Sequence, residues 1–268
     1  MLNTIGFLGC GNMGGAIARA VCKAADPQNV WLANRTAAKA EALAAELGCN
    51  TTINDEVAGR CDLIFLAVKP QMMEELLAPL RFTLAERPSR FVLCSMAAGL
   101  SIARIQEMAG GDCPVIRIMP NTPAAVGAGM IQYCTSNVTA EEEAEFLKLM
   151  APAGRLDAVP EGLIDAASCV SGCGPAWVYQ FIEALADGGV ACGLPRAKAQ
   201  EYAAQMVLGS AKLVLESGQH PGALKDAVCS PGGSTIQGVR VLEEKGLRGA
   251  VMDAVIASYN KTTEMGKG

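Results

Sequence analysis

The chain has 268 residues, of which 51% are hydrophobic and 18% charged, so it can bury the core of one large domain or of two ordinary ones. Its formal net charge is −5 and it contains no basic block, which argues against nucleic-acid binding. No apolar stretch approaches about 20 uncharged residues, so we expect no membrane span.

The first part of the chain alternates short apolar runs with helical patterns, which is typical of β-α-β units and a parallel sheet. The ranges expected to form strands are 4–8, 30–33, 51–53, 62–68, 91–94, 115–118, 129–133 and 154–157. Helices are expected at 14–25 and 36–47, the second ended by Gly48. This pattern predicts an α/β fold with a doubly wound, Rossmann-type sheet.

The pattern changes near position 158, and no convincing strand follows position 161. About four helical segments are expected there, with Pro195 in the first turn of one of them. We therefore predict a first domain of residues 1–158 and an all-helical domain of residues 159–268. Its helices are apolar on more than one side, so we expect it to pair with another subunit. A compact monomeric bundle is the alternative.

The run Gly9–Gly14 follows the first strand and opens the first helix. In this context the glycine spacing indicates a dinucleotide-binding turn, although an ordinary glycine turn is the alternative. Gly9 permits the tight turn, Gly11 lets the backbone approach a pyrophosphate, and Gly14 allows the helix to pack closely. Asn12 and Met13 complete the turn, and the free N–H groups of the helix face the phosphates.

The second strand is followed by Asn34, Arg35 and Thr36, with Lys39 one helical turn further on. A domain specific for NADH would place an acidic side chain there, on the adenine ribose. Arg35 and Thr36 can instead bind a 2′-phosphate. The sequence therefore predicts a preference for NADPH, with NADH as a weaker substitute; a solvated Arg35 is the alternative.

The loops after the later strands are further candidates, because ligands of such sheets bind outside the carboxyl ends of the strands. Asn121 can hydrogen-bond a ribose or a carboxamide. Lys69 is catalytic, cofactor-binding or structural, and we favour the second. The residues of these loops that we expect at the cofactor are Ala67, Val68, Lys69, Pro70, Ala97 and Asn121.

The run Ser230–Thr235 precedes a helix expected from about Ile236 to Glu244. Its two glycines and its hydroxyls before a helix N-terminus suit a small anion such as a carboxylate. A plain N-cap is an equally good interpretation. His220 is the single histidine and precedes Pro221, so we expect a loop or capping role for it rather than catalysis. The sequence thus lacks a hydrolase arrangement, which fits hydride transfer.

The eleven cysteines are scattered, and the nearest pair, Cys169 and Cys173, lacks the spacing of zinc or redox motifs. We therefore expect no bound metal. We interpret the cysteines as small buried side chains of a cytoplasmic protein, since thiols stay reduced in that compartment.

The sequence as a whole resembles the pyrroline-5-carboxylate reductase family, whose members catalyse the last step of proline synthesis. The resemblance spans essentially the whole chain, and its most specific block lies in the C-terminal part. The segments that carry it are 5–14, 67–70, 119–123, 171–176 and 220–236.

This resemblance implies that residues 1–158 bind NADP and that residues 159–268 form a helical domain that interleaves with that of a partner. Dimers of the family assemble into larger rings, commonly decamers. The substrate it implies is L-1-pyrroline-5-carboxylate, a cyclic imine that is reduced to L-proline by hydride from NADPH.

The family's substrate loop corresponds to Ser230–Thr235, with Ser230, Gly232, Gly233, Ser234 and Thr235 as substrate-binding residues. The resemblance implies that backbone amides near Ser234 and Thr235 hold the carboxylate. It also implies that the Thr235 hydroxyl faces the ring nitrogen, which makes Thr235 the expected catalytic residue. Position 234 varies among relatives, which matters little if its contribution is a backbone N–H.

Two other functions are alternatives to imine reduction. A β-hydroxyacid dehydrogenase-like enzyme would need a helical lysine, for which Lys198 or Lys225 could be proposed, but neither lies in that family's signature. A sensor that binds NADPH without turnover would need no anion-binding loop at Ser230–Thr235. We rank both below imine reduction.

Overall fold

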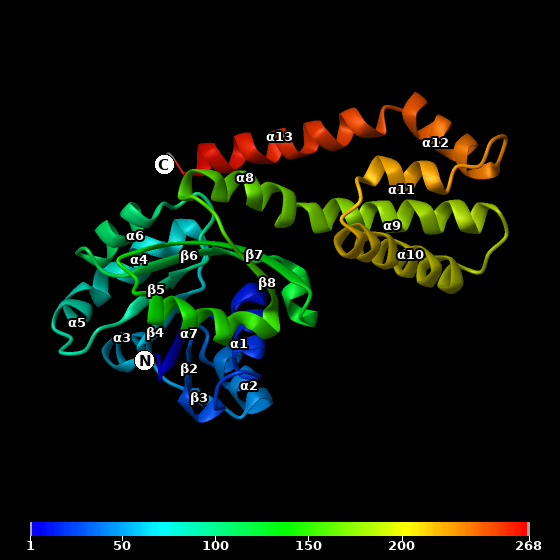
Figure 1. Ribbon diagram of the computed structural model, residues 1–268. Helices are drawn as coiled ribbons and strands as arrows, with labels where there is room; N and C mark the ends of the chain where they lie inside the picture. Colours follow the sequence, from blue (N-terminus) through cyan, green and yellow to red (C-terminus); the bar gives the residue numbers. More distant parts are fainter. Residues whose placement is uncertain (1, 267–268) are drawn as a thin grey trace. The chain divides into compact units, whose positions relative to one another are not determined.

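The computed structural model describes residues 2–266 and divides the chain into two compact units (Figure 1). The first unit comprises the chain up to Cys173 together with the segment from Ser258 onward. The second comprises Gly174–Ala257. The sequence pattern predicted a domain boundary near residue 158. The division into compact units falls after Cys173 instead, because the helix that follows residue 158 packs against the sheet of the first unit.

The first unit is built on one sheet with the strand order β3-β2-β1-β4-β5-β6-β7-β8. The strands are β1 (Ile5–Leu8), β2 (Val30–Ala33), β3 (Asn50–Thr51), β4 (Leu63–Leu66), β5 (Val92–Ser95), β6 (Val115–Met119), β7 (Gly129–Ser136) and β8 (Gly154–Ala158). All neighbours are parallel except β6 and β7. The strand order reverses between β1 and β4, which is the switch point of a doubly wound sheet.

Helices cover both faces of this sheet (Figure 1). They are α1 (Asn12–Val21), α2 (Ala37–Leu47), α3 (Asn54–Arg60), α4 (Met73–Leu77), α5 (Arg81–Ala85), α6 (Ile102–Ala109), α7 (Ala140–Met150) and α8 (Glu161–Ser171). Buried side chains of α1, α2 and α7 pack on one face, and those of α3 to α6 and α8 on the other. The predicted Rossmann-type fold is therefore confirmed.

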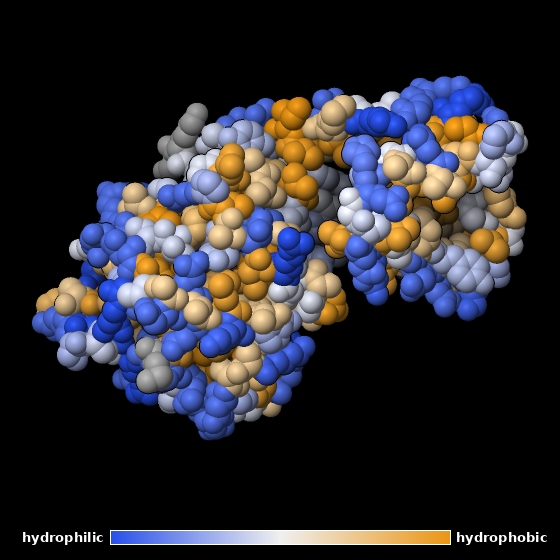
Figure 2. All heavy atoms as spheres, in the orientation of Figure 1, coloured by the Kyte–Doolittle hydropathy of each residue, from blue (hydrophilic) through white to orange (hydrophobic). Residues whose placement is uncertain are grey.

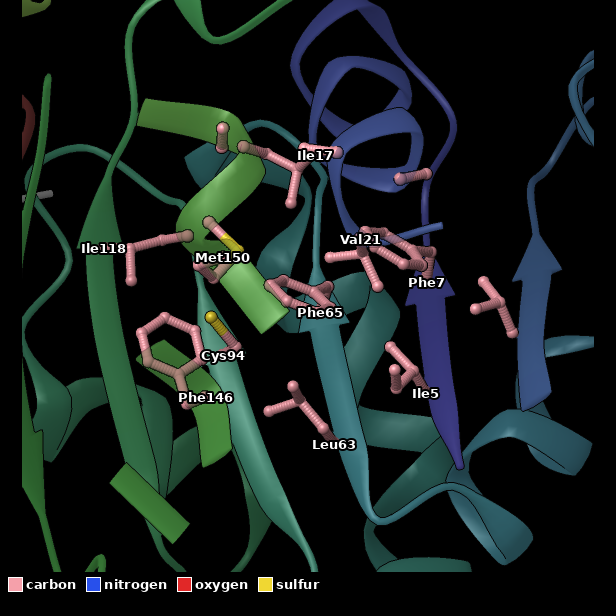
Figure 3. Close-up of a cluster of buried hydrophobic side chains, with 14 of the residues drawn as sticks. Ile5, Phe7, Ile17, Val21, Leu63, Phe65, Cys94, Ile118, Phe146 and Met150 are labelled. Carbon is pink, nitrogen blue, oxygen red and sulfur yellow. The ribbon is translucent and has the colours of Figure 1, made fainter. Parts of the chain in front are cut away.

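Alternate residues of the central strands supply the two layers of the core, one of which is shown in Figure 3. Phe7 of β1 and Phe65 of β4 stack with ring centroids 4.5 Å apart, and both are fully buried. Ile17 of α1 and Met150 of α7 lie in the same layer. Burying one such side chain stabilises the fold by about 1.5–3 kcal/mol. This layer holds the carboxyl ends of β1 and β4 in fixed register.

Short 3-10 turns connect several elements, and each carries proline in its first two positions, where a missing N–H costs nothing. These turns are η1 (Pro27–Asn29), η2 (Pro70–Met72), η3 (Ala78–Leu80), η4 (Thr122–Val126) and η5 (Ala151–Ala153).

The second unit consists of helices whose large apolar side chains are mostly exposed. The helices are α9 (Gly174–Ala191), α10 (Arg196–Ser217), α11 (Pro221–Ala227), α12 (Ser234–Glu244) and α13 (Leu247–Met265), whose last turns belong to the first unit. Within Gly174–Ala257 the buried hydrophobic side chains are three alanines, Ala186, Ala199 and Ala203. Leu208, Leu215 and Met252 are each more than 60% exposed, and apolar surface is visible over this unit in Figure 2. One copy of the unit thus lacks a core of its own.

The end of α13 closes against the first unit. The Cys169 sulfur lies 3.7 Å from the Thr262 hydroxyl oxygen. Gly99, at φ +75°, packs so closely that an added Cβ would lie 3.1 Å from the Thr262 carbonyl oxygen. This contact joins residues that are more than 160 positions apart in sequence.

Several predicted boundaries were wrong. Helix α1 begins at Asn12 rather than at 14, because the Gly15 N–H already bonds to the Gly11 carbonyl. It ends at Val21 rather than at 25, because the N–H groups of Lys23 and Ala24 bond three residues back, in tighter turns. Helix α12 begins at Ser234, two residues earlier than predicted. Pro195 is the N-cap of α10 rather than part of its first turn.

The cysteines are all free thiols in the structure, and burial raises the pKa of several of them. Cys61, Cys94, Cys134 and Cys169 are buried, whereas Cys192 is exposed. Burial raises the pKa of Cys61 to about 12, which keeps that thiol protonated and unreactive. Within residues 2–266, no cluster of three metal-binding side chains is found, and no helix is long and apolar enough to span a bilayer.

Candidate functional site

A cleft of about 620 Å³ opens at the carboxyl ends of β1 and β4, where the strand order reverses. This is the position at which doubly wound sheets bind ligands. The residues that line it are Leu8, Gly9, Gly11, Asn34, Arg35, Thr36, Lys39, Asn54, Ala67, Val68, Lys69, Gln71, Met72, Glu75 and Leu76. The structure therefore brings together the glycine turn, the loop after β2 and the loop after β4, as the sequence predicts.

Two glycines of the turn are required by close backbone contacts. Gly9 has φ +115°, and an added Cβ would lie 2.5 Å from the Ala67 carbonyl oxygen. At Gly14 an added Cβ would lie 2.4 Å from the Gly9 carbonyl oxygen and 2.9 Å from the Ala67 Cβ. Real Cβ contacts are not this short, so neither position accepts a side chain without a backbone shift. These contacts hold the start of α1 against the loop after β4.

Gly11 has no such structural reason to be glycine. Its φ is −72°, which any residue can adopt, and nothing lies within 4 Å of an added Cβ. It is the N-cap of α1, and no side chain caps this helix. The N–H groups of the first turn are therefore without helical partners, and they favour an anion. The open space at Gly11 fits the close approach of a pyrophosphate to the backbone.

The Asn34 side chain holds the two neighbouring loops together. Its Oδ1 atom accepts a hydrogen bond from the Cys10 N–H at 2.9 Å, and its Nδ2 donates to the Thr36 carbonyl oxygen at 2.9 Å. Asn34 thus fixes the glycine turn relative to the loop that carries Arg35, in addition to lining the cleft.

Arg35, Lys39 and Lys69 are exposed cations in the lining of the cleft. Within the described chain, none of the three side chains is paired with a carboxylate. Glu75 supplies the acidic side chain of the lining. Uncompensated cations around a helix N-terminus produce a site for a ligand with several negative charges.

Some predicted cofactor residues lie outside this lining. Asn12, Met13 and Gly14 form the first turn of α1, and Pro70 begins η2. Ala97 is only 1% exposed. Asn121 is 7% exposed, and its amide is hydrogen-bonded within the protein. A direct role of these residues at a cofactor stays a prediction.

One wall of the cleft was not predicted from the sequence. It is formed by Asn54 at the start of α3 and by residues of η2 and α4, namely Gln71, Met72, Glu75 and Leu76. Gln71 and Glu75 lie one helical turn apart, as do Met72 and Leu76. Both pairs are on one side of the segment that follows Lys69-Pro70. That spacing was the available signal, but it also describes an ordinary amphipathic helix.

In the second unit, the run Ser230–Thr235 connects α11 to α12. Gly232 has φ +70°, and the Gly233 N–H bonds to the Ser230 carbonyl oxygen at 3.0 Å. Gly233 is the N-cap of α12, without a side-chain cap. The plain N-cap that the sequence left open is thus present in the structure, and the anion site stays a prediction. Ser234 and Thr235 are exposed, and their hydroxyls bond to no described residue.

The other candidate side chains have local structural partners. His220 is the N-cap of α11, and its Nδ1 accepts the Gly222 N–H at 3.0 Å, which confirms the capping role. Lys225 pairs with Asp226 at 2.7 Å, and this hydrogen bond raises the pKa of the lysine. Lys198 pairs with Glu201 at 2.9 Å. Each lysine thus has a carboxylate partner close to it in sequence.

Comparison with known proteins explains both halves of this arrangement. Residues 4–99 match a family described as NADP oxidoreductase coenzyme F420-dependent, and residues 161–265 match pyrroline-5-carboxylate reductase dimerisation. The chain is 43% identical over 271 residues to pyrroline-5-carboxylate reductase of Escherichia coli (strain K12), covering all of both chains. It belongs to the pyrroline-5-carboxylate reductase family.

Other relatives agree. The enzyme of that name from Synechocystis is 46% identical over 215 residues, which cover 80% of this chain and 79% of the relative. A crystal structure of Plasmodium falciparum pyrroline carboxylate reductase with NADP bound matches with a TM-score of 0.89 at 34% identity, over 99% of each chain. The resemblance predicted from the sequence is confirmed, and neither the hydroxyacid dehydrogenase-like function nor the sensor is favoured.

Gly11 and Gly14 are glycine for different reasons, so an added methyl group should affect ligand binding at the first position and stability at the second. Gly11→Ala fills space that only a ligand needs, so we expect dinucleotide binding to weaken by at least about tenfold while stability falls by less than about 1 kcal/mol. Gly14→Ala meets backbone and is expected to cost about 1–3 kcal/mol. Fluorescence titration with NADPH and thermal unfolding measure the two effects. A Gly11→Ala protein with unchanged affinity contradicts this account.

Proposed function

We propose that this protein reduces L-1-pyrroline-5-carboxylate to L-proline with a nicotinamide dinucleotide, as the last step of proline biosynthesis in the cytoplasm. The observation that carries the proposal is the end-to-end identity of 43% with a reductase of that name. The dinucleotide cleft of the first unit and the exposed anion-binding turn of the second supply the two binding functions that such a reaction needs.

The preferred cofactor in this proposal is NADPH. Gly11 and the first turn of α1 would hold the pyrophosphate, and Arg35, Thr36 and Lys39, which line the same cleft, would hold the adenosine 2′-phosphate. Arg35 can donate two parallel hydrogen bonds to a phosphate, which gives this contact both strength and direction. No acidic side chain follows β2 at the position where it would hold the 2′-hydroxyl of NADH.

The substrate carboxylate binds to backbone N–H groups of Ser234 and Thr235 at the start of α12, where the helix dipole favours an anion. Ser230, Gly232 and Gly233 form the turn that leads into this helix. The Thr235 hydroxyl, which bonds to no described residue, orients the ring nitrogen. It can pass a proton to that nitrogen as the imine becomes an amine only while it takes up another from water, so that the hydroxyl itself is unchanged.

When bound, the reduced nicotinamide supplies the hydride that is added to C5 of the ring. A cyclic imine is basic enough to be protonated without a strong enzymatic acid. The side chains therefore have to orient the two reacting carbons at about 3–3.5 Å and exclude water, and they need not form a covalent bond.

The assembly in this proposal is a dimer formed through the second unit, and dimers join into a decamer. The exposed apolar side chains of α9 to α13 support the first step, since one copy leaves them in water. Light scattering measures the assembly, and a mass equal to one 27.8 kDa chain would exclude it.

A spectrophotometric assay of NADPH oxidation with pyrroline-5-carboxylate tests the reaction. Proline formation equal to the NADPH consumed supports the proposal. Tight NADPH binding without turnover would indicate a sensor, and oxidation of hydroxy acids with NADP would indicate the dehydrogenase-like function.

Arg35→Ala tests the cofactor preference. We expect kcat/KM with NADPH to fall by about 10- to 100-fold, because the variant loses a charge-assisted hydrogen bond, while kcat/KM with NADH changes little. Arg155→Ala, which removes an exposed arginine from β8 at the opposite edge of the sheet, is the matched control. Equal losses with both cofactors would remove Arg35 from 2′-phosphate recognition.

Thr235→Ala tests the role of the hydroxyl. Turnover should fall by about 10- to 100-fold, with a smaller change in KM, because the backbone N–H groups that hold the carboxylate remain. Thr235→Ser keeps a hydroxyl at this position and should recover most of the rate. An alanine variant with wild-type kcat would exclude Thr235 from the reaction.

A further inference from the structure

A buried amide network joins three elements at one end of the sheet. Asn121 follows β6, and its Nδ2 donates to the Ser171 carbonyl oxygen at 3.0 Å. Its Oδ1 accepts from the Met130 N–H of β7, also at 3.0 Å. The Ser171 hydroxyl donates to Oε1 of Gln132 on β7 at 2.9 Å. Asn121 and Gln132 are 7% and 4% exposed, so water competes little for these bonds.

The other end of α8 has a separate anchor. Arg117 of β6 is 2% exposed, and its guanidinium lies 2.5 Å from Asp165 and 3.4 Å from Glu161. Glu161 also accepts the Ile102 N–H at 2.6 Å, at the start of α6. The first half of α8 is therefore held by ion pairs to the middle of β6. Its last residue, Ser171, is held by the neutral network around Asn121.

The place of this second anchor matters for function. Asn121 begins the loop at the carboxyl end of β6, which is the edge of the sheet where ligands bind. Ser171 is followed by Gly172 and Cys173, with which the first unit's main segment ends. Since the Asn121 carbonyl and one amide N–H are used within the protein, the side chain keeps one N–H for any other partner.

We propose that Asn121 is a positioning residue, which fixes the last turn of α8 against β7, rather than a ligand of the cofactor. Gln132 and Ser171 serve the same purpose. Removal of this anchor leaves the last turn of α8 without these polar bonds to β7 and to the loop after β6, with the contact of Cys169 to Thr262 as its remaining polar contact in the described chain, so this turn and that loop can shift together. The kinetic consequence rests on the reductase function proposed above, whereas the structural one does not.

Asn121→Leu tests this role, because it keeps a branched side chain of similar size and removes both polar atoms. We expect amide hydrogen exchange in residues 168–173 to accelerate by at least about tenfold, with exchange at 161–165 unchanged. NADPH affinity should stay within about twofold of the wild-type value. In contrast, kcat should fall on the order of 10- to 100-fold, because the last turn of α8 and the loop after β6 are misplaced. Asp165→Asn is the matched control and should accelerate exchange at the start of α8 alone.

A second pair of variants covers the case in which Asn121→Leu does not fold. Ser171→Ala removes the hydroxyl that reaches Gln132 and should reproduce the local exchange effect, and Ser171→Thr should restore the wild-type pattern. NADPH binding that weakens about tenfold or more with unchanged exchange in 168–173 would make Asn121 a cofactor ligand and overturn the proposal. A wild-type protein that does not reduce pyrroline-5-carboxylate refutes the reductase function, while exchange and NADPH titration still decide the role of Asn121.

Discussion

The contact between the glycine turn and the loop after β4 is the constraint on which the cofactor cleft depends. The backbone at Gly9 and Gly14 lies so close to Ala67 that a single methyl group would separate them. This contact aligns the start of α1 with the carboxyl ends of β1 and β4. The free N–H groups of the first turn of α1 therefore lie at the cleft that these strand ends form. The stacked rings of Phe7 and Phe65, which lie in one layer of the core, hold the same two strands together. The phosphate site that we propose here therefore depends first on backbone packing, and the contacts proposed for the side chains would add selectivity.

Much of the first unit was predictable, because a sheet buried on both faces leaves a strong pattern. Each central strand is an apolar run, and the glycines and prolines mark its ends. What the sequence could not locate were features that depend on contacts between distant segments. The wall of the cleft at Gln71–Leu76 follows a helical pattern that has many uses. The amide of Asn121 looked available for a ligand, because its partners at Met130 and Ser171 are 9 and 50 residues away.

The second unit illustrates a different limit. Its apolar side chains were visible in the sequence, and they indicated a missing partner, but the sequence could not say which surfaces stay exposed. In the structure, small alanines form what little interior the helices have, while leucines and methionines face outward. The turn at Gly233 is also set by backbone geometry. It places Ser234 and Thr235 inside the first helical turn, so their N–H groups belong to the helix terminus rather than to a loop.

The return of α13 to the first unit has a consequence for the order of events during synthesis. Gly99 and Cys169 meet Thr262, a residue that leaves the ribosome only after the whole of Gly174–Ala257 has been made. The sheet and its helices can form earlier from local β-α-β units, yet this last contact must wait for the helices in between to be made. The first unit is thus completed only after the segment inserted into it has been synthesised, and a nascent chain that stalls before residue 258 lacks the segment that closes over Gly99.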